Sequence, residues 1–148
     1  MTTNRDQAVD ETEIRTLMED WAEALRARDV DAIASSQAPD IVSFDVVGPL
    51  RYVGSDASRG RAEAWLSSFQ GPVDLEIRDL RVAVGDDVAF AYSLNRVSGA
   101  TVDGRRVDMW LRSTVCYRRI DEKWTVTHQH SSVPFDGESG RASLDLQP

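Results

Sequence analysis

The first half of the chain carries a helical pattern of hydrophobic positions. Apolar residues recur there at intervals of three and four, and the first set is Ile14, Leu17, Met18, Trp21 and Leu25. This spacing places all of them on one face of a helix, which we predict over residues 10–28. Asp10 and Glu13 stand where a pair of capping side chains would begin it.

Two shorter helices and one strand are predicted next. A helix over 29–38 opens at Asp29 and ends before Pro39, because the proline ring removes an amide donor. Residues 41–47 are apolar and β-branched, which favours a strand, and 48–54 follow as a loop. A third helix over 57–70 is indicated by helical spacing of Ala62, Trp65, Leu66 and Phe69.

After Pro72 the pattern alternates between apolar and polar positions. Val73 and Ile77 have odd numbers whereas Leu80 and Val84 have even ones, so a β-bulge near Arg78 and Asp79 would keep one face apolar. Further strands are predicted over 88–98, 106–119 and 124–132. Helices followed by antiparallel strands are typical of an α+β fold. We therefore expect the helices to cover the concave face of a curved sheet of four to six strands.

The chain is long enough for one domain, which we place over 1–148 with a flexible start at 1–9 and a polar C-terminal tail at 137–148. Its 25 acidic and 17 basic residues leave a net charge of −8, which argues against nucleic acid or an anionic membrane as a partner. The polar, acidic N-terminus is unlike a signal peptide, so we expect a cytoplasmic protein. A single cysteine, Cys116, excludes an intrachain disulfide.

His128 and His130 share the parity of Trp124 and Val126 in the last predicted strand, which places both on its more apolar face. They are either neutral, hydrogen-bonded core residues or a pair that transfers protons to a ligand. A metal site would need a third ligand, such as Asp45 or Asp108. We predict that both histidines are buried and metal-free.

Asp45 interrupts an apolar strand, so it lies either at an exposed edge or in a pocket, where it could act as a general base. Arg112 either anchors an anionic group or pairs with Asp45 or Asp108. In the long strand predicted over 106–119, the odd-numbered positions are more apolar than the even-numbered ones, so they are more suited to face the core. They include Val107, Met109, Leu111, Val115 and Tyr117. Parity alone does not decide which face of that strand lines a cavity.

Two stretches resemble the nuclear transport factor 2-like (NTF2-like) superfamily, which includes ketosteroid isomerases and SnoaL-like cyclases. The ending from Trp124 through His128 and His130 to Phe135 is similar to that of ketosteroid isomerase homologues. The ending also resembles the calcium/calmodulin-dependent kinase association domain, which is an assembly module. The run Asp45, Val46, Val47, Gly48 resembles the segment that carries the catalytic aspartate in the true isomerases.

The resemblance implies a cone-shaped, cystatin-like fold of three N-terminal helices on a curved mixed or antiparallel sheet. Asp45 then takes the general-base position, and Trp21 stands where the isomerases have a tyrosine that donates a hydrogen bond. We expect a homodimer that binds a small hydrophobic or carbonyl-containing ligand and acts as an isomerase, cyclase or dehydratase without a cofactor or metal. Alternatively, the domain binds a ligand or assembles without catalysis.

The expected site combines catalytic and lining residues from several segments. Asp45 would be the base, His128 and His130 acid or orienting groups, and Arg112 a group that polarises an oxygen. The cavity walls are expected to contain Trp21, Tyr52, Trp65, Asn95 and Trp110.

Overall fold

The computed structural model describes residues 4–148 of the chain. A helical part precedes a long antiparallel part, as the hydrophobic pattern predicts. In chain order the elements are α1 (Asn4–Arg26), α2 (Val30–Ala34), β1 (Gln37–Phe44), β2 (Tyr52–Val53), α3 (Ser55–Ser67), β3 (Phe69–Val84), β4 (Val88–Thr101), β5 (Arg106–Ile120) and β6 (Lys123–Ser132).

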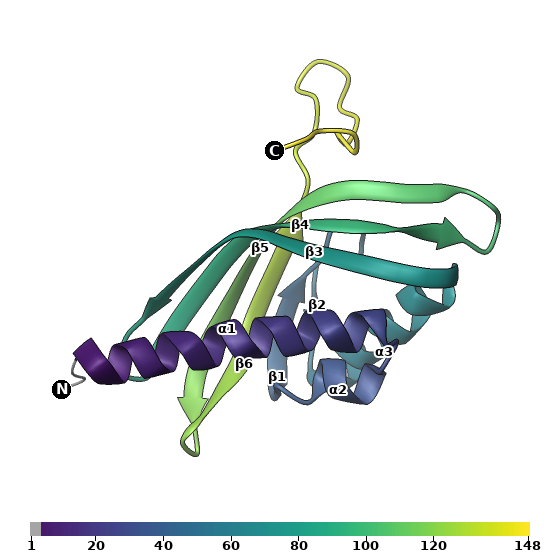
Figure 1. Cartoon of the computed structure of the whole chain (residues 1–148). Coiled ribbons are helices and arrows are strands. Elements are labelled where there is room, and N and C mark those ends of the chain that lie inside the picture. The colour runs from purple at the N-terminus through teal and green to yellow at the C-terminus, as the bar shows by residue number, and fades with distance from the viewer. Residues whose placement is uncertain (1–3) are drawn as a thin grey trace.

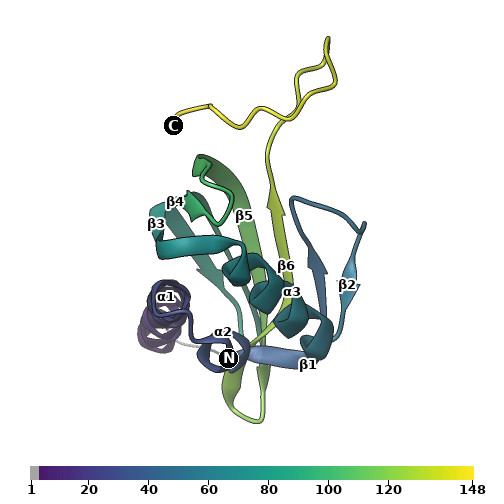
Figure 2. The same cartoon turned by 90° about the vertical axis from the view of Figure 1, so that its right-hand side faces the viewer.

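The strands form one six-stranded sheet with the order β2-β1-β6-β5-β4-β3. Neighbouring strands are antiparallel except β1 and β6, which run parallel, so the sheet is mixed. The sheet curves strongly, and α1 runs along its concave side with α2 and α3 close to one end (Figures 1 and 2). The predicted α+β architecture is therefore confirmed.

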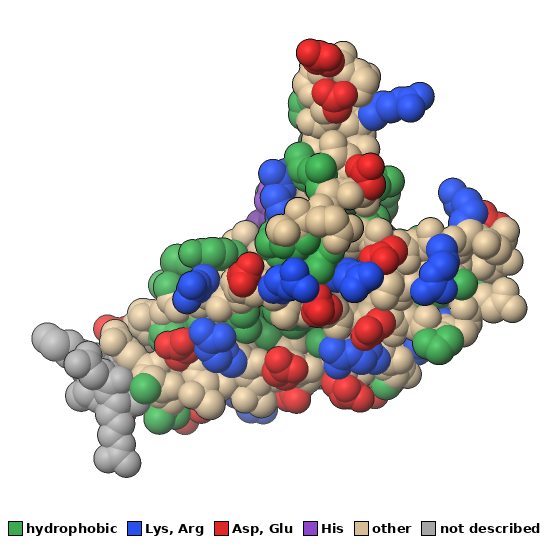
Figure 3. All heavy atoms as spheres, turned by 45° about the horizontal axis from the view of Figure 1, so that its top comes forward, with side chains coloured by type: hydrophobic (Ala, Val, Ile, Leu, Met, Phe, Trp, Pro, Cys, Tyr) green, Lys and Arg blue, Asp and Glu red, His purple; other side chains and the backbone are tan. Residues whose placement is uncertain are grey.

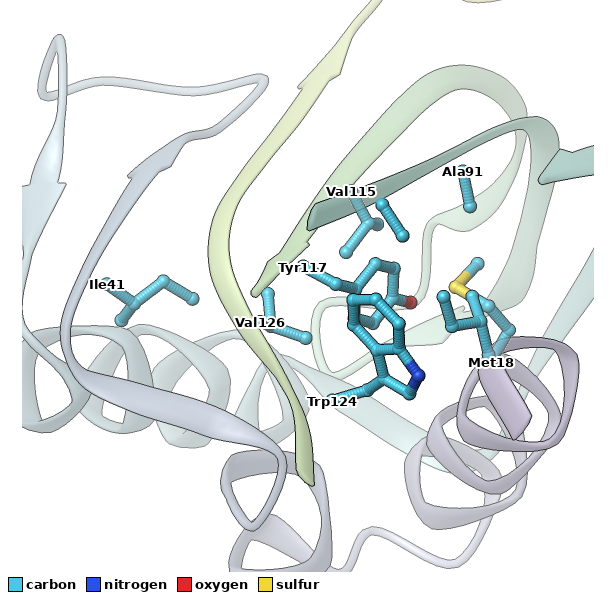
Figure 4. Packing of buried hydrophobic residues seen from close by; sticks show 9 residues of the cluster. Met18, Ile41, Ala91, Val115, Tyr117, Trp124 and Val126 are labelled. Atoms are coloured by element: carbon cyan, nitrogen blue, oxygen red, sulfur yellow. The ribbon is translucent and has the colours of Figure 1, made fainter. Parts of the chain in front are cut away.

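The hydrophobic face of α1 packs on the concave side of the sheet. Ile14 and Met18 lie in one core cluster with Tyr117 of β5 and Trp124 of β6, all at most 5% exposed. Figure 4 shows Met18 reaching from the helix toward these rings. A second cluster lies toward α3 and includes Leu25. The helical spacing of the first apolar set thus identifies its buried face correctly.

The predicted start of the first helix at residue 10 is wrong, because α1 already begins at Asn4. Of the predicted flexible start, residues 1–3 lie outside the described residues, and 4–9 are helical. Asp10 is therefore no cap. It is 6% exposed and accepts hydrogen bonds from Arg119 Nη2 at 2.7 Å and from Trp124 Nε1 at 3.3 Å. These partners come from the far end of the chain, which local capping rules do not consider.

Helix α2 begins as predicted, with Asp29 as the N-cap whose carboxylate accepts from Ala32 N at 3.1 Å. It ends at Ala34, however, and β1 starts at Gln37 and contains Pro39. The strand register between β1 and β6 shifts between Gln37 and Val42. The proline therefore lies in an irregular stretch where its missing amide costs no ladder hydrogen bond.

The other predicted bounds need smaller corrections. Helix α3 covers Ser55–Ser67 rather than 57–70, and the loop predicted over 48–54 contains the two-residue strand β2. The bulge predicted in β3 is confirmed by a register shift between Arg78 and Arg81, where Asp79 has a φ of 56°. None of the helices in the described part of the chain is long and apolar enough to cross a membrane.

Candidate functional site

A cavity of about 290 Å³ lies between the helices and the concave face of the sheet. The helices contribute an apolar wall, because they turn their hydrophobic faces toward the sheet. This wall consists mainly of Leu17, Met18, Trp21, Leu25, Ile33, Ala62, Trp65 and Leu66. Opposite it, the strands contribute both apolar and polar side chains.

A row of polar residues crosses the sheet on the cavity side. Ser93 of β4 is opposite Ser113 of β5, which in turn is opposite Ser131 of β6. Ser113, Ser131 and Asn95 line the cavity, and Asn95 is only 3% exposed to solvent. The Ser93 hydroxyl donates to Asn95 Oδ1 at 2.7 Å. Because the acceptor end of this amide is occupied, its NH₂ group is the end available to a ligand.

The polar row continues onto β1. Gln129 of β6 donates from Nε2 to the Ser43 hydroxyl at 3.2 Å, and both residues line the cavity. Gln37 also lines it, and its Oε1 atom is buried without a hydrogen-bond partner among the described residues. A buried acceptor without a partner is costly, so this atom is suited to accept a hydrogen bond from a bound molecule.

Asp45 follows the last residue of β1 and lines the cavity. Its Oδ2 atom lies 3.0 Å from Arg61 Nε, and its Oδ1 accepts from the Val46 amide at 2.7 Å. The Asp45 and Arg61 side chains are 28% and 21% exposed. They are the only charged residues among the described residues of the cavity wall. The wall therefore carries one ion pair and no net charge.

Sequence reasoning missed Arg61. It lies on α3, where the helical spacing singles out the apolar positions, whereas an arginine on a helix is ordinarily a surface residue. Only the packing of α3 beside the end of β1 brings its guanidinium to Asp45. The sequence does indicate that Asp45 needs a cationic partner, because a carboxylate in an apolar strand is costly to bury alone. It does not indicate that this partner is Arg61.

The structure places five of the predicted site residues in the cavity wall, namely Trp21, Asp45, Tyr52, Trp65 and Asn95. Tyr52 lies near the Asp45 loop, since its hydroxyl donates to the Gly48 carbonyl at 3.3 Å. The other four, Trp110, Arg112, His128 and His130, do not line this cavity and lie on the opposite face of the sheet.

A bulge in β6 explains why both histidines lie on that outer face. Tyr117 pairs with Val126 whereas the preceding Cys116 pairs with His128, so Thr127 has no partner of its own. The extra residue reverses the alternation. Before the bulge, the even-numbered residues of β6 face the cavity, as Val126 does. After the bulge, the odd-numbered residues Gln129 and Ser131 face it instead.

The prediction that the histidines are buried is therefore wrong. His130 is exposed and His128 is partly buried. His128 Nδ1 donates to the Val42 carbonyl at 2.6 Å, and both rings stand edge-on to Phe44, with centroids 4.7 and 5.5 Å away. Since these contacts occur on the outer face, a role for the histidines inside the cavity has no support from their position.

Arg112 also has other partners than predicted. Its Nε donates to the Ser132 hydroxyl at 3.2 Å, while Asp108 pairs with Arg96 at 2.8 Å. Each carboxylate considered for Arg112 thus has a different arginine. On the same face, Arg78 lies over the Trp110 ring at 4.5 Å from its centroid.

Among residues 4–148, no group of three or more His, Cys, Asp or Glu side chains is close enough to hold a metal ion.

A helical layer on a curved mixed sheet, with a cavity between them, defines the class of NTF2-like proteins. Residues 14–136 match the SnoaL-like domain, so the chain belongs to the SnoaL-like family within that class. A comparison with curated proteins found no match.

Solved structures share the whole fold. An NTF2-like protein of unknown function from Pseudomonas putida is 37% identical, covering 95% of this chain and 98% of that one with a TM-score of 0.88. A protein with a cystatin-like fold from Caulobacter vibrioides is 19% identical, covering 88% and 93% with a TM-score of 0.73. A hexachlorocyclohexane dehydrochlorinase is 17% identical, covering 99% and 98% with a TM-score of 0.78.

Proposed function

We propose that the protein binds a small, uncharged, mostly apolar molecule with a carbonyl or hydroxyl group and catalyses proton transfer on it without a cofactor. The observation that carries this proposal is the position of Asp45. It is the one carboxylate among the described wall residues of an otherwise mainly apolar cavity. A carboxylate held beside a bound ligand is a suitable general base.

The charges and polar groups of the wall favour a neutral ligand. Arg61 and Asp45 neutralise each other, so an anionic or cationic ligand would have to break that pair. Asn95 and Ser113 offer hydrogen bonds to an oxygen atom, and Trp21 and Trp65 offer flat apolar surfaces. A cavity of about 150 Å³ holds benzene. The 290 Å³ here therefore suit one or two rings.

Proton transfer in this cavity requires a base and a group that stabilises the electrons left behind. Asp45 takes a proton from carbon next to the ligand carbonyl, and the electron pair of the broken C–H bond moves onto the carbonyl oxygen. Arg61 or the Asn95 amide donates a hydrogen bond to that oxygen. Return of the proton to another carbon completes an isomerisation, whereas loss of a leaving group from the next carbon completes an elimination.

Another structure of this fold supports elimination as one of these outcomes. The similar dehydrochlorinase is named for removing hydrogen chloride from hexachlorocyclohexane, a neutral six-membered ring. At 17% identity this likeness concerns the fold, so the reaction of the present chain rests on its own residues.

One observation favours a second function, binding without catalysis. Both Asp45 oxygens already have a partner, because Oδ2 forms the ion pair with Arg61 and Oδ1 accepts a hydrogen bond from the Val46 amide. A carboxylate satisfied in this way could serve only to hold α3 against the end of β1. A carboxylate offers about four acceptor positions, however, so the same contacts leave room for a proton.

Proton exchange separates the two functions without knowledge of the natural substrate. Cyclic ketones of one or two rings are incubated with the protein in D₂O, and loss of the signals of protons next to the carbonyl is followed by NMR. If Asp45 is the base, Asp45→Asn keeps the shape but cannot accept the proton. We expect exchange to slow by about 100- to 10,000-fold.

Asp40→Asn is the matched control, because Asp40 is an exposed carboxylate on β1, the strand that directly precedes Asp45. It should leave the exchange rate unchanged. Equal rates for wild type and Asp45→Asn, together with a lower melting temperature of Asp45→Asn, would reject the catalytic role. That result would instead assign Asp45 to the structural ion pair.

We also propose that the protein is a homodimer. The outer face of the sheet carries exposed hydrophobic side chains, including Val88, Phe90 and Tyr92, which are 56%, 47% and 51% exposed. Covering such a surface with a second copy is favourable because it removes apolar area from water. Sedimentation equilibrium should give twice the chain mass of 16.5 kDa, and a single-chain mass over the accessible concentrations would reject the dimer.

A further inference from the structure

The segment after β6 forms a separate arm, which we define as residues 133–148. It leaves the end of β6 and stands clear of the sheet in both perpendicular views (Figures 1 and 2). The arm is held by its own contacts. Phe135 and Ala142 form a β-bridge, Asp136 N donates to the Arg141 carbonyl at 2.7 Å, and Ser143 N donates to the Pro134 carbonyl at 2.8 Å. It is therefore a closed loop with a defined shape.

The arm exposes large apolar side chains. Phe135, Leu144 and Leu146 are 69%, 49% and 52% exposed. An isolated exposed leucine is normal, but three such side chains in one short arm form an apolar surface that the described residues leave exposed to solvent. The family match ends at residue 136, so most of this arm lies beyond the part of the chain that it covers.

The outer face of the sheet offers a surface of matching character. Phe90 and Tyr92 of β4 stack with their ring centroids 6.4 Å apart, and Trp110 and the two histidines lie on the same side of the next strands. Figure 3 shows hydrophobic side chains gathered around the foot of the arm, with charged side chains beside them. The two apolar surfaces thus adjoin each other.

The charges of the two surfaces are complementary. The arm carries three carboxylates, Asp136, Glu138 and Asp145, against one arginine, Arg141. On the outer side of β4 and β5 the relation is reversed. The charged residues there are Arg96, Arg106, Arg112, Arg118 and Asp108. Arg96 already pairs with Asp108, so Arg106, Arg112 and Arg118 are the arginines of β4 and β5 that favour an acidic partner.

We propose that the arm of one chain packs on the outer sheet face of a second copy and that the second arm does the same in return. Apolar side chains such as Leu144 and Leu146 would lie against Phe90, Tyr92 and Trp110, and the arm carboxylates near Arg112. Each chain carries both the arm and the outer sheet face. A dimer with a two-fold axis therefore forms the same arm-on-sheet contact twice. The proposal rests on the homodimer proposed above and adds which segments exchange.

Paramagnetic relaxation between two chains tests the exchange directly. One chain carries Cys116→Ser and Gln147→Cys with a nitroxide label at the new cysteine, and it is mixed with a ¹⁵N-labelled Cys116→Ser chain without a nitroxide. In the mixed dimer we expect the amides of Tyr92, Trp110 and Arg112 in the ¹⁵N-labelled chain to broaden. Reduction of the nitroxide with ascorbate should restore them.

A pair of variants provides a second measurement on the full chain. Leu144→Asp with Leu146→Asp should raise the dimer dissociation constant by about 10- to 100-fold, because two apolar contacts are lost and two charges added. Leu50→Asp is the control, since Leu50 is 94% exposed on the loop before β2. It should leave the dissociation constant unchanged.

The outcomes distinguish the exchange from the dimer itself. A dimer without broadening between chains, and with the same dissociation constant in the Leu144 and Leu146 variant, overturns the arm exchange and leaves the dimer intact. A monomer at every concentration overturns both. Neither result affects the proton exchange assigned to Asp45, which is measured on the cavity.

Discussion

Asp10 and Asp45 are both carboxylates placed among apolar side chains, and each is held by an arginine from another element. Arg119 Nη2 lies 2.7 Å from Asp10, and Arg61 Nε lies 3.0 Å from Asp45. Asp10 also accepts from Trp124, which Arg119 covers at 4.3 Å from the ring centroid. The first pair ties α1 to the sheet in the core, whereas the second opens onto the cavity. The same pair of residue types thus serves structure at one place and a candidate site at the other.

Replacing Asp10 should be costly because Asp10 and its partner Trp124 are buried, and its second partner Arg119 is partly buried. In Asp10→Ala, the Trp124 indole N–H and Arg119 lose their acceptor, and we expect the free energy of unfolding in urea to fall by about 2 to 3 kcal/mol. Asp20→Ala is the control on the same helix, since Asp20 is exposed. Its effect should stay within about 0.5 kcal/mol. Similar small losses for both variants would show that the buried contacts contribute little.

A β-bulge, which is a single extra residue in a strand, decides on which face of the sheet the following side chains lie. The bulge in β3 keeps its apolar residues on the concave side, and the hydrophobic pattern predicts it because the parity of those residues changes. The bulge at Thr127 in β6 leaves no such trace, since polar residues follow it on both faces. The alternation therefore predicts the face of Trp124 and Val126 correctly and the face of His128 and His130 wrongly.

Close packing between elements also constrains β4 at Gly99. A Cβ atom there would lie 2.9 Å from Phe69 Cδ1 and 3.1 Å from the Pro72 carbonyl oxygen. Phe69 is 5% exposed and cannot move freely. We expect Gly99→Ala to lower the free energy of unfolding by about 1 to 3 kcal/mol, as overpacking does.

Replacing Gly60 by alanine should have the opposite effect on the free energy of unfolding. It lies in α3, and no atom lies within 4 Å of an added Cβ. Since alanine favours a helix interior, Gly60→Ala should raise the free energy of unfolding by about 0.5 to 1 kcal/mol. Chemical denaturation measures both variants. A Gly99→Ala protein as stable as wild type would show that Phe69 has room to shift.

At the scale of the whole molecule, one sheet separates two surfaces of different character. The concave face holds the core and the cavity with its polar row, and the outer face holds exposed aromatic, histidine and arginine side chains. Tyr117 lies at the border between core and cavity, and it is 2% exposed. Burial raises the pKa of its phenol above the ordinary value of 10.0.

That pKa shift makes the stability of the fold depend on pH. In the unfolded chain Tyr117 loses its proton above about pH 10, whereas in the folded chain it keeps it. Its contribution is therefore complete below pH 10 and is lost as the pH rises further, by up to about 1.4 kcal/mol per pH unit. Urea denaturation between pH 9 and 11.5 should show a steeper decline for wild type than for Tyr117→Phe. Parallel curves would contradict the shift.

The sequence by itself determined the class of fold, because hydrophobic periodicity reports which face of each helix and strand is buried. It also indicated Asp45, Trp21, Tyr52, Trp65 and Asn95 as cavity residues, through an interrupted apolar strand and the family resemblance. These features depend on residues that are close together in the chain, or on short motifs that resemble those of a known family.

The tertiary structure alone decided which distant side chains meet. Arg61 reaches Asp45 because α3 packs beside the end of β1, and Arg119 reaches Asp10 across 109 positions of the chain. It also decided the face of His128 and His130, since a bulge changes alternation only through pairing with the neighbouring strand. Ion pairs and strand register arise from contacts between separate elements, and a pattern along one chain does not record them.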